Sequence, residues 1–332
     1  MTQPKLLLLS PAFHGYWKAI QASLEVHGYD VRTHIYDAPG TLSERILNKL
    51  AHELPEKYRP ESFAAQATRK AIGAFNGFRP DIVLVIKGDM LSREWWDLLE
   101  TSGVRYGTWL YDEMRRMSYT EEDLHHLGAL ASYSPLDAQH LRKQGFEVLD
   151  MPNAYDTHCP VVPMREDSIN FVGAKYPNRE ETLQALVSAG LPVRAYGRAW
   201  SRHLYDILRT KQFKDSGVPA GRDIDRSEAY GIMASSPATL NIHNNQDGFT
   251  MRTFEAPGVG ALQVIDRPDV DRYYIPGEEV LVYESIDELI EICTRIFRDP
   301  KWARKIREAG QKRTLAEHTF DQRVKILEQL WA

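Results

Sequence analysis

The chain has 332 residues, 43% of them hydrophobic and 26% charged, with a formal net charge of −5. This length exceeds what one hydrophobic core usually serves, so two domains are expected. The negative charge gives no support to a broad nucleic-acid-binding surface. The two cysteines, Cys159 and Cys293, fit neither a disulfide framework nor a metal-binding spacing, which favours a reducing compartment. The apolar run at 6–9 is too short for a signal peptide or a membrane span, so we expect a cytoplasmic protein.

The first half of the chain alternates short apolar runs with segments of helical spacing. Strands are predicted at 5–10, 31–36, 81–86, 106–111, 129–133 and 147–149, and helices at 15–27, 42–54, 62–75, 92–99 and 135–143. Parallel strands that are buried on both faces read as unbroken apolar runs, as these do, and strands separated by helices indicate βαβ units. The pattern predicts an α/β domain with a parallel sheet over 1–155.

A proline-rich stretch at 151–167 without periodicity predicts the linker between domains. The alternation then resumes. Strands are predicted at 169–172, 192–196, 238–243, 261–265 and 279–283, and helices at 179–189, 226–234, 251–256, 285–297, 301–309 and 320–330. We therefore expect a second Rossmann-like domain over 156–312, with ligands at the carboxyl ends of its strands.

A polar loop at 244–250 is the stretch around which the second domain is organised. Its Gly248 allows close approach of a ligand or a positive φ. The helix that follows would offer free N–H groups and a positive dipole end, which suit a phosphate. Asp247 and Glu255 could border one pocket and bind sugar or ribose hydroxyls, with Arg252 as a forked partner for a diphosphate. An ordinary strand–loop–helix–strand unit has the same spacing, so both interpretations stay open.

The last third of the chain carries a series of short motifs. They are, in order, Arg252-Thr-Phe-Glu255, Gly260, Pro276-Gly277-Glu278, Asp299-Pro300, Gly310, and His318-Thr319-Phe320 with Arg323. In this order they resemble the C-terminal domain of GT-B glycosyltransferases, and more narrowly the CgeB-like (spore maturation protein) branch of the group 1 glycosyltransferases. Two positions depart from the pattern. Asp247 stands where group 1 enzymes usually carry glutamate, and Pro257 predicts a kinked or short helix.

The resemblance implies a GT-B fold, with two Rossmann-like domains facing each other across a cleft. A nucleoside-diphosphate sugar would bind the C-terminal domain, an acceptor hydroxyl would bind the N-terminal domain, and the segment 313–332 would cross back to the N-terminal domain. GT-B transferases generally need no metal, so cationic side chains would neutralise the leaving diphosphate. The sequence has no Walker pattern and no Gly-x-Gly-x-x-Gly after the first strand, against a nucleotide hydrolase or a nicotinamide enzyme.

Several residues at strand ends and in the polar loop are candidates for donor binding. They are Gly173, Lys175 and Arg179 for the diphosphate, Gly197 and Arg198 for the nucleobase edge, and Gly248, Phe249 and Thr250 in the loop. Each has an equally plain interpretation as part of a solvated loop. Trp200 could stack on a base, although a lone aromatic is more often a packing residue.

Three positions are candidates on the acceptor side. His14 follows the first strand, its pKa range suits a general base, and it resembles the histidine that inverting GT-B enzymes carry there. Asp112 ends another strand and could orient His14 or bind the acceptor, and the segment 87–89 follows a third. Against inversion, Asp247 and Glu255 resemble the paired acids of retaining group 1 enzymes. The resemblance to retaining enzymes covers a longer stretch than the single histidine, so retention of the anomeric configuration is favoured. His14 would then contact the sugar or the acceptor.

Two other functions share this architecture. One is a catalytically silent GT-B binding or assembly protein, which Asp247 and Pro257 would suit. The other is a nucleotide-sugar epimerase. The acceptors within reach are a polysaccharide, a small molecule, a protein or a modified nucleobase, and the protein could be a monomer or a homodimer.

Overall fold

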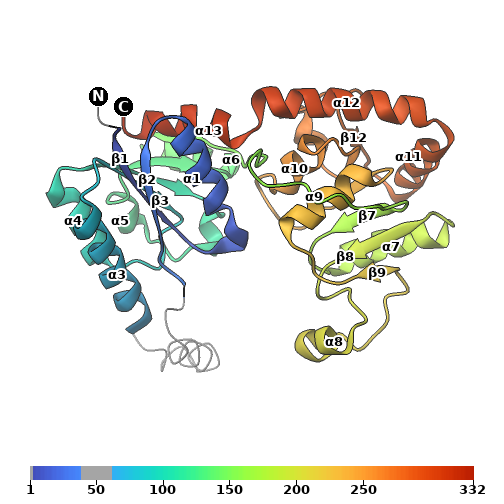
Figure 1. Cartoon of the computed structure of the whole chain (residues 1–332), viewed down its shortest axis with the longest axis horizontal. Coiled ribbons are helices and arrows are strands. Elements are labelled where there is room, and N and C mark those ends of the chain that lie inside the picture. Colours follow the sequence, from blue (N-terminus) through green and yellow to red (C-terminus); the bar gives the residue numbers. More distant parts are fainter. Residues whose placement is uncertain (1–2, 39–61) are drawn as a thin grey trace. The chain divides into compact units, whose positions relative to one another are not determined.

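The structure, a computed structural model, describes residues 3–38 and 62–332. The predicted helix at 42–54 lies outside these ranges. The chain divides into two compact units, one of Met1–Pro152 with Phe320–Ala332 and one of Asn153–Thr319. Each unit contains a six-stranded sheet whose neighbouring strands are parallel, with helices around it (Figure 1). The predicted α/β class, with two Rossmann-like units, is confirmed.

The first unit has the strand order β2-β1-β3-β4-β5-β6. Its strands are β1 (Lys5–Ser10), β2 (Asp30–Ile35), β3 (Ile82–Ile86), β4 (Arg105–Leu110), β5 (Ala129–Ser132) and β6 (Val148–Asp150). Its helices are η1 (Phe13–Gly15), α1 (Trp17–Val26), α3 (Ser62–Phe78), α4 (Arg93–Ser102), η3 (Met114–Arg116), α5 (Glu121–Leu124), α6 (Pro135–Lys143), α13 (Phe320–Leu327) and η5 (Glu328–Leu330).

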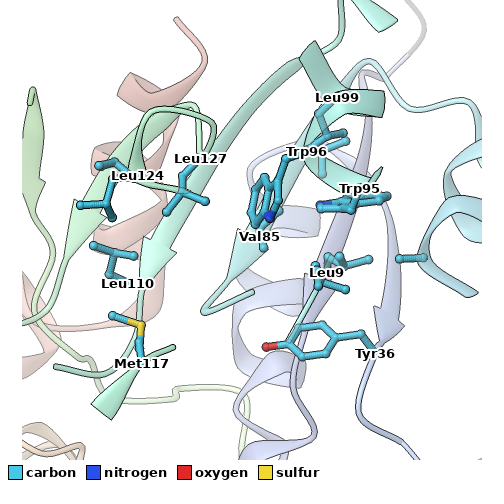
Figure 2. Packing of buried hydrophobic residues seen from close by; sticks show 14 of the residues in the cluster. Leu9, Tyr36, Val85, Trp95, Trp96, Leu99, Leu110, Met117, Leu124 and Leu127 are labelled. Atoms are coloured by element: carbon cyan, nitrogen blue, oxygen red, sulfur yellow. The ribbon is translucent and has the colours of Figure 1, made fainter. Parts of the chain in front are cut away.

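Both faces of this sheet are covered, which explains its unbroken apolar strands. On one face Leu9 and Val85 pack against Trp95 and other side chains of α3, α4 and α5 (Figure 2). On the other face, β4 carries Gly107, where a Cβ would lie 2.8 Å from the Cβ of Leu330 in η5. A side chain at that position would push the C-terminal segment away from the sheet.

The second unit has the strand order β12-β11-β10-β7-β8-β9. Its strands are β7 (Ile169–Val172), β8 (Val193–Tyr196), β9 (Ala220–Gly221), β10 (Thr239–Asn241), β11 (Gln263–Ile265) and β12 (Leu281–Val282). Its helices are α7 (Pro177–Ser188), α8 (Leu204–Thr210), α9 (Arg226–Ser235), α10 (Arg252–Gly258), η4 (Pro268–Arg272), α11 (Ile286–Arg298) and α12 (Pro300–Glu317). One core joins the sheet to α7, α11 and α12, and a second core contains residues of α9, α10 and the neighbouring loops.

The last long helix differs from its predicted bounds. The sequence suggested an end at Ala309, before Gly310, but α12 continues to Glu317. A Cβ at Gly310 would lie 2.3 Å from the carbonyl oxygen of Glu279, so this glycine allows close packing rather than ending the helix. The C-terminal segment that belongs to the first unit therefore begins at Phe320, whereas the expected segment was 313–332. Within this unit, α13 packs against α1.

Several short elements were not predicted, among them α5, α8 and β9. Each of these has seven residues or fewer, which is too short for a hydrophobic period to be recognised in the sequence. No helix of the described residues is long and apolar enough to cross a membrane.

Candidate functional site

The strand order places a topological switch point in each unit. In the second unit, β8 and β9 lie on one side of β7, while β10, β11 and β12 lie on the other. The loops that follow β7 and β10 therefore leave the same edge of the sheet in opposite directions, and open α/β sheets bind ligands in the crevice between such loops. These loops contain Gly173, Lys175 and the predicted polar loop 244–250. In the first unit the switch point lies between β1 and β3.

The corner after β7 and β8 is tightly packed. Gly173 N–H donates to Tyr196 O at 3.0 Å, and the indole Nε1 of Trp200 donates to Gly173 O at 3.0 Å. Gly197 has a φ of 151°, and a Cβ there would lie 2.6 Å from Gly173 O. Trp200 is buried and its ring packs edge-on against Phe171, so it is a core residue in this structure. The close packing at this corner therefore explains why glycine stands at 173 and 197, independently of any ligand.

The cationic residues beside this corner all have partners. Lys175 Nζ lies 3.0 Å from Glu180 Oε1 and 5.6 Å from the centre of the Trp200 ring. Arg198 pairs with Asp223 at 2.9 Å, with both side chains partly exposed. Lys175 lies on the loop after β7, at the switch point, whereas Arg198 follows β8.

Arg179, on α7, holds the two switch-point loops together. Its Nε donates to Ile242 O at 2.8 Å and its Nη1 to Ala174 O at 3.0 Å. Burial lowers the pKa of this guanidinium from its usual range. The sequence suggested a diphosphate ligand here, whereas the structure shows a buried residue that binds one carbonyl from each loop.

The loop after β10 is held from both sides. Asn178 donates to His243 O at 2.8 Å, and Arg267 donates to the carbonyls of Gln246 at 2.9 Å and Asp247 at 3.2 Å. The guanidinium of Arg267 also lies 4.5 Å from the centre of the buried Phe249 ring. The loop that carries Gly248, Phe249 and Thr250 is therefore well supported.

Buried His243 and partly buried Asp266 form a pair that was not singled out from the sequence. The backbone N–H of His243 lies 2.8 Å from Asp266 Oδ2, and its Nδ1 lies 2.8 Å from Asp266 Oδ1. Its Nε2 is buried and has no hydrogen-bond partner among the described residues. His243 is the last residue of the strand predicted at 238–243 and Asp266 directly follows the strand predicted at 261–265, so their position at strand ends was the available signal. The pair fixes the start of the polar loop to the end of β11.

Arg252 and Glu255 form an ion pair on α10. Glu255 is fully buried, its Oε2 lies 2.8 Å from Arg252 Nη1, and its Oε1 accepts a hydrogen bond from Tyr230 at 3.2 Å. Asp247 lies on the half-exposed loop instead. Glu255 is thus enclosed and engaged by Arg252, rather than open to a sugar hydroxyl as the sequence suggested.

The first turn of α10 also differs from the prediction. Its N–H groups are used within the chain: Thr253 donates to Thr250 O, and both Phe254 and Glu255 donate to Met251 O. The helix has seven residues and contains Pro257, which agrees with the predicted short helix. The expected row of free N–H groups for a phosphate is therefore not present at these three positions.

The first unit gathers charges at the carboxyl ends of β3 and β4. Lys87 Nζ lies 3.2 Å from Asp112 Oδ2 and 3.8 Å from Asp89 Oδ2. Burial raises the pKa of Asp89, and the nearby Lys87 opposes this rise. Asp112 therefore pairs with Lys87, and the described residues show no hydrogen bond from it to His14.

His14 lies on η1, directly after β1. Its backbone is left-handed, with a φ of 45°, and its side chain is exposed. The ring packs edge-on against Phe13 at 5.0 Å, and Phe13 in turn packs against Tyr111 at 6.2 Å. Within the described part of the chain, the imidazole has no hydrogen-bond partner, so both nitrogens are available to a ligand. The loop after β1 is thereby placed beside the end of β4.

Comparisons with known proteins agree with this architecture. Residues 179–329 match the family model described as glycosyl transferase-like. The spore protein CgeB of Bacillus subtilis (strain 168) is 20% identical over 265 residues, which cover 74% of this chain and 81% of that protein.

Solved structures share the fold over nearly the whole chain. A glycosyltransferase from Rickettsia africae ESF-5 superposes with a TM-score of 0.66 at 12% identity, covering 99% of this chain and 98% of that one. HepE of Anabaena, in complex with UDP-glucose, has a TM-score of 0.63 at 12% identity and covers 98% of both chains. Together, these likenesses show that the chain has the fold of GT-B glycosyltransferases, and that it is similar to the glycosyl transferase-like family over 179–329 and to CgeB.

Proposed function

We propose that the protein transfers a sugar from a nucleoside-diphosphate sugar to an acceptor hydroxyl. The observation that carries this proposal is the switch point between β7 and β10, where glycines and the polar loop 244–250 meet at one edge of the second sheet. Likeness to HepE, which was solved with UDP-glucose, supports a nucleotide-sugar donor. The first unit would bind the acceptor near its own switch point, beside His14 and Asp112.

Lys175 is the residue we assign to the donor diphosphate. It lies on the loop after β7, and its present partner Glu180 would be exchanged for the phosphate. Arg252 is a second candidate, but its pairing with buried Glu255 makes exchange costly. A nucleotide that binds at 100 times its dissociation constant should stabilise the fold by about 2.7 kcal/mol. A thermal-shift screen over nucleoside diphosphates and their sugars would therefore identify the base.

Lys175→Met is expected to weaken binding of that nucleotide by about 10- to 100-fold, because a hydrogen bond to a charged group contributes about 1.5–3 kcal/mol. Glu180→Gln is the matched control, since it removes the competing carboxylate and should keep or raise the affinity. Calorimetry with both variants tests the assignment. Equal affinity of Lys175→Met and wild type would remove Lys175 from the site.

Turnover assays separate transfer from the two other functions. Consumption of the donor that requires an acceptor supports a transferase. Conversion of the donor sugar with no acceptor present would indicate an epimerase. Tight binding without turnover under any acceptor would indicate a binding or assembly protein.

Transfer is expected to be independent of added metal. The described residues contain no group of three or more His, Cys, Asp or Glu side chains that could hold a metal ion. Cationic side chains can stabilise a leaving diphosphate in its place. Activity should therefore persist in excess EDTA. Loss of activity on chelation, with recovery on adding Mn²⁺ or Mg²⁺, would contradict this expectation.

A further inference from the structure

The helix α8 and the turn after it expose a cluster of large apolar side chains. The exposed fractions are 77% for Leu204, 59% for Tyr205, 69% for Leu208 and 67% for Phe213. Single exposed apolar residues are ordinary, whereas a contiguous group marks an interaction surface. Figure 1 shows α8 standing out from the sheet of its own unit. We call these four residues, together with the basic residues Arg202, Arg209, Lys211 and Lys214, the α8 patch.

The inner side of α8 is held by polar contacts. Asp206 is buried, and its Oδ2 accepts hydrogen bonds from Ser201 Oγ at 2.8 Å and from Arg222 Nε at 2.9 Å. Leu204 and Leu208 are four positions apart and therefore share one side of the helix. Asp206 is two positions from each leucine and therefore lies on the opposite side of the helix. Because Asp206 faces inward, the side with Leu204 and Leu208 faces outward.

The exposed charges of the α8 patch are all basic. Between 202 and 214 they are Arg202, Arg209, Lys211 and Lys214, and the single acidic residue of that span, Asp206, is buried and paired with Arg222. The next acidic residue, Asp215, lies 3.7 Å from Arg202. This local positive charge contrasts with the net charge of −5 for the whole chain.

We propose that the α8 patch docks the protein on an anionic lipid surface. The leucines and aromatic rings would enter the headgroup region while the basic side chains contact lipid phosphates. A second copy of the chain is a poorer occupant, because a two-fold contact would bring the same basic residues together. A nucleic acid would satisfy the cations but leave Leu204 and Leu208 without an apolar partner.

Co-sedimentation of the full chain with lipid vesicles tests this proposal. Wild type is expected to bind vesicles that mix phosphatidylcholine with phosphatidylglycerol, to bind phosphatidylcholine alone more weakly, and to dissociate as salt is raised. The charge variant should lower the affinity for mixed vesicles by about a hundredfold, since each basic residue near the surface contributes about 1 kcal/mol. Its substitutions are Arg209→Gln, Lys211→Asn and Lys214→Gln.

An apolar variant separates insertion from simple charge attraction. It carries Leu204→Ser, Leu208→Ser and Phe213→Ser, and its affinity should fall by at least about tenfold. The matched control removes three exposed apolar side chains elsewhere, with Val26→Ser, Leu136→Ser and Leu315→Ser, and should bind like wild type. All six positions are exposed, so the variants should fold, which circular dichroism checks.

Three results would overturn the proposal. The first is no binding of wild type to the mixed vesicles. The second is equal loss in the control and the apolar variant. The third is a wild-type dimer in sedimentation velocity that becomes a monomer in the apolar variant, which would assign the α8 patch to a second copy of the chain.

Discussion

Replacing Arg252 by methionine is expected to lower the free energy of unfolding by about 3–5 kcal/mol. Glu255 is fully buried, and Arg252 Nη1 lies 2.8 Å from its Oε2. Removing the guanidinium leaves the buried, desolvated carboxylate of Glu255 without this cationic partner. Glu255→Gln should cost less, about 1–2 kcal/mol, because Arg252 keeps a side-chain exposure of 21% and can be hydrated. Urea unfolding of both variants, followed by tryptophan fluorescence, measures the difference.

The double variant of Arg252→Met with Glu255→Gln is the control for this interpretation. It removes both charges, so it should be more stable than Arg252→Met alone. Tyr230→Phe should cost about 1 kcal/mol, because it removes one neutral donor from Glu255. If Arg252→Met is as stable as wild type and instead loses nucleotide affinity, then Arg252 is a donor ligand, as the sequence alone suggested.

Loss of His14 is expected to impair turnover, and the product is expected to keep the anomeric configuration of the donor. His14 is exposed directly after β1, beside the switch point of the first sheet. The structure shows Asp112 paired with Lys87 at 3.2 Å, so it does not orient His14 as it would in a base pair for inversion. Under retention, His14→Ala removes a contact to sugar or acceptor and should lower kcat/KM by about 10- to 100-fold.

Proton NMR of the product, compared with that of the donor, measures the stereochemical course. His14→Gln is the informative second variant, because an amide keeps hydrogen bonding but is no base. Partial activity of His14→Gln with a retained product fits the expectation. An inverted product, with a loss of about 10²–10⁴-fold in both variants, would make His14 the general base instead. Full activity of His14→Ala would remove the residue from the site.

Most strands of the sheets could be predicted from the sequence, because buried parallel strands carry a local signal. Leu6–Leu9 and Ile82–Ile86 are buried along their whole length, so each is an unbroken apolar run in the sequence. The caps are local as well. Ser285, three positions before Glu288, accepts a hydrogen bond from Glu288 N at 3.2 Å at the start of α11.

The roles of several site residues could not be predicted, because their partners are distant in the sequence. Arg179 binds Ile242 O, and the same spacing would serve an exposed phosphate ligand. Lys87 pairs with Asp112, which decides what that carboxylate can orient. Each charged residue suggested a ligand contact, whereas the structure gives Arg179 two backbone carbonyls and gives Asp112 the cationic partner Lys87.

The sequence by itself determined the α/β class, the strands at both sheets' centres and the motifs of the C-terminal region, because each depends on neighbours along the chain. Only the tertiary structure decided the strand orders, since the side on which a crossover adds the next strand leaves no periodicity. Those orders set the switch points, and with them which loops meet. The packing of Gly310 against Glu279 likewise decided that α12 runs on to Glu317, because a glycine's effect on a helix depends on what lies beside it.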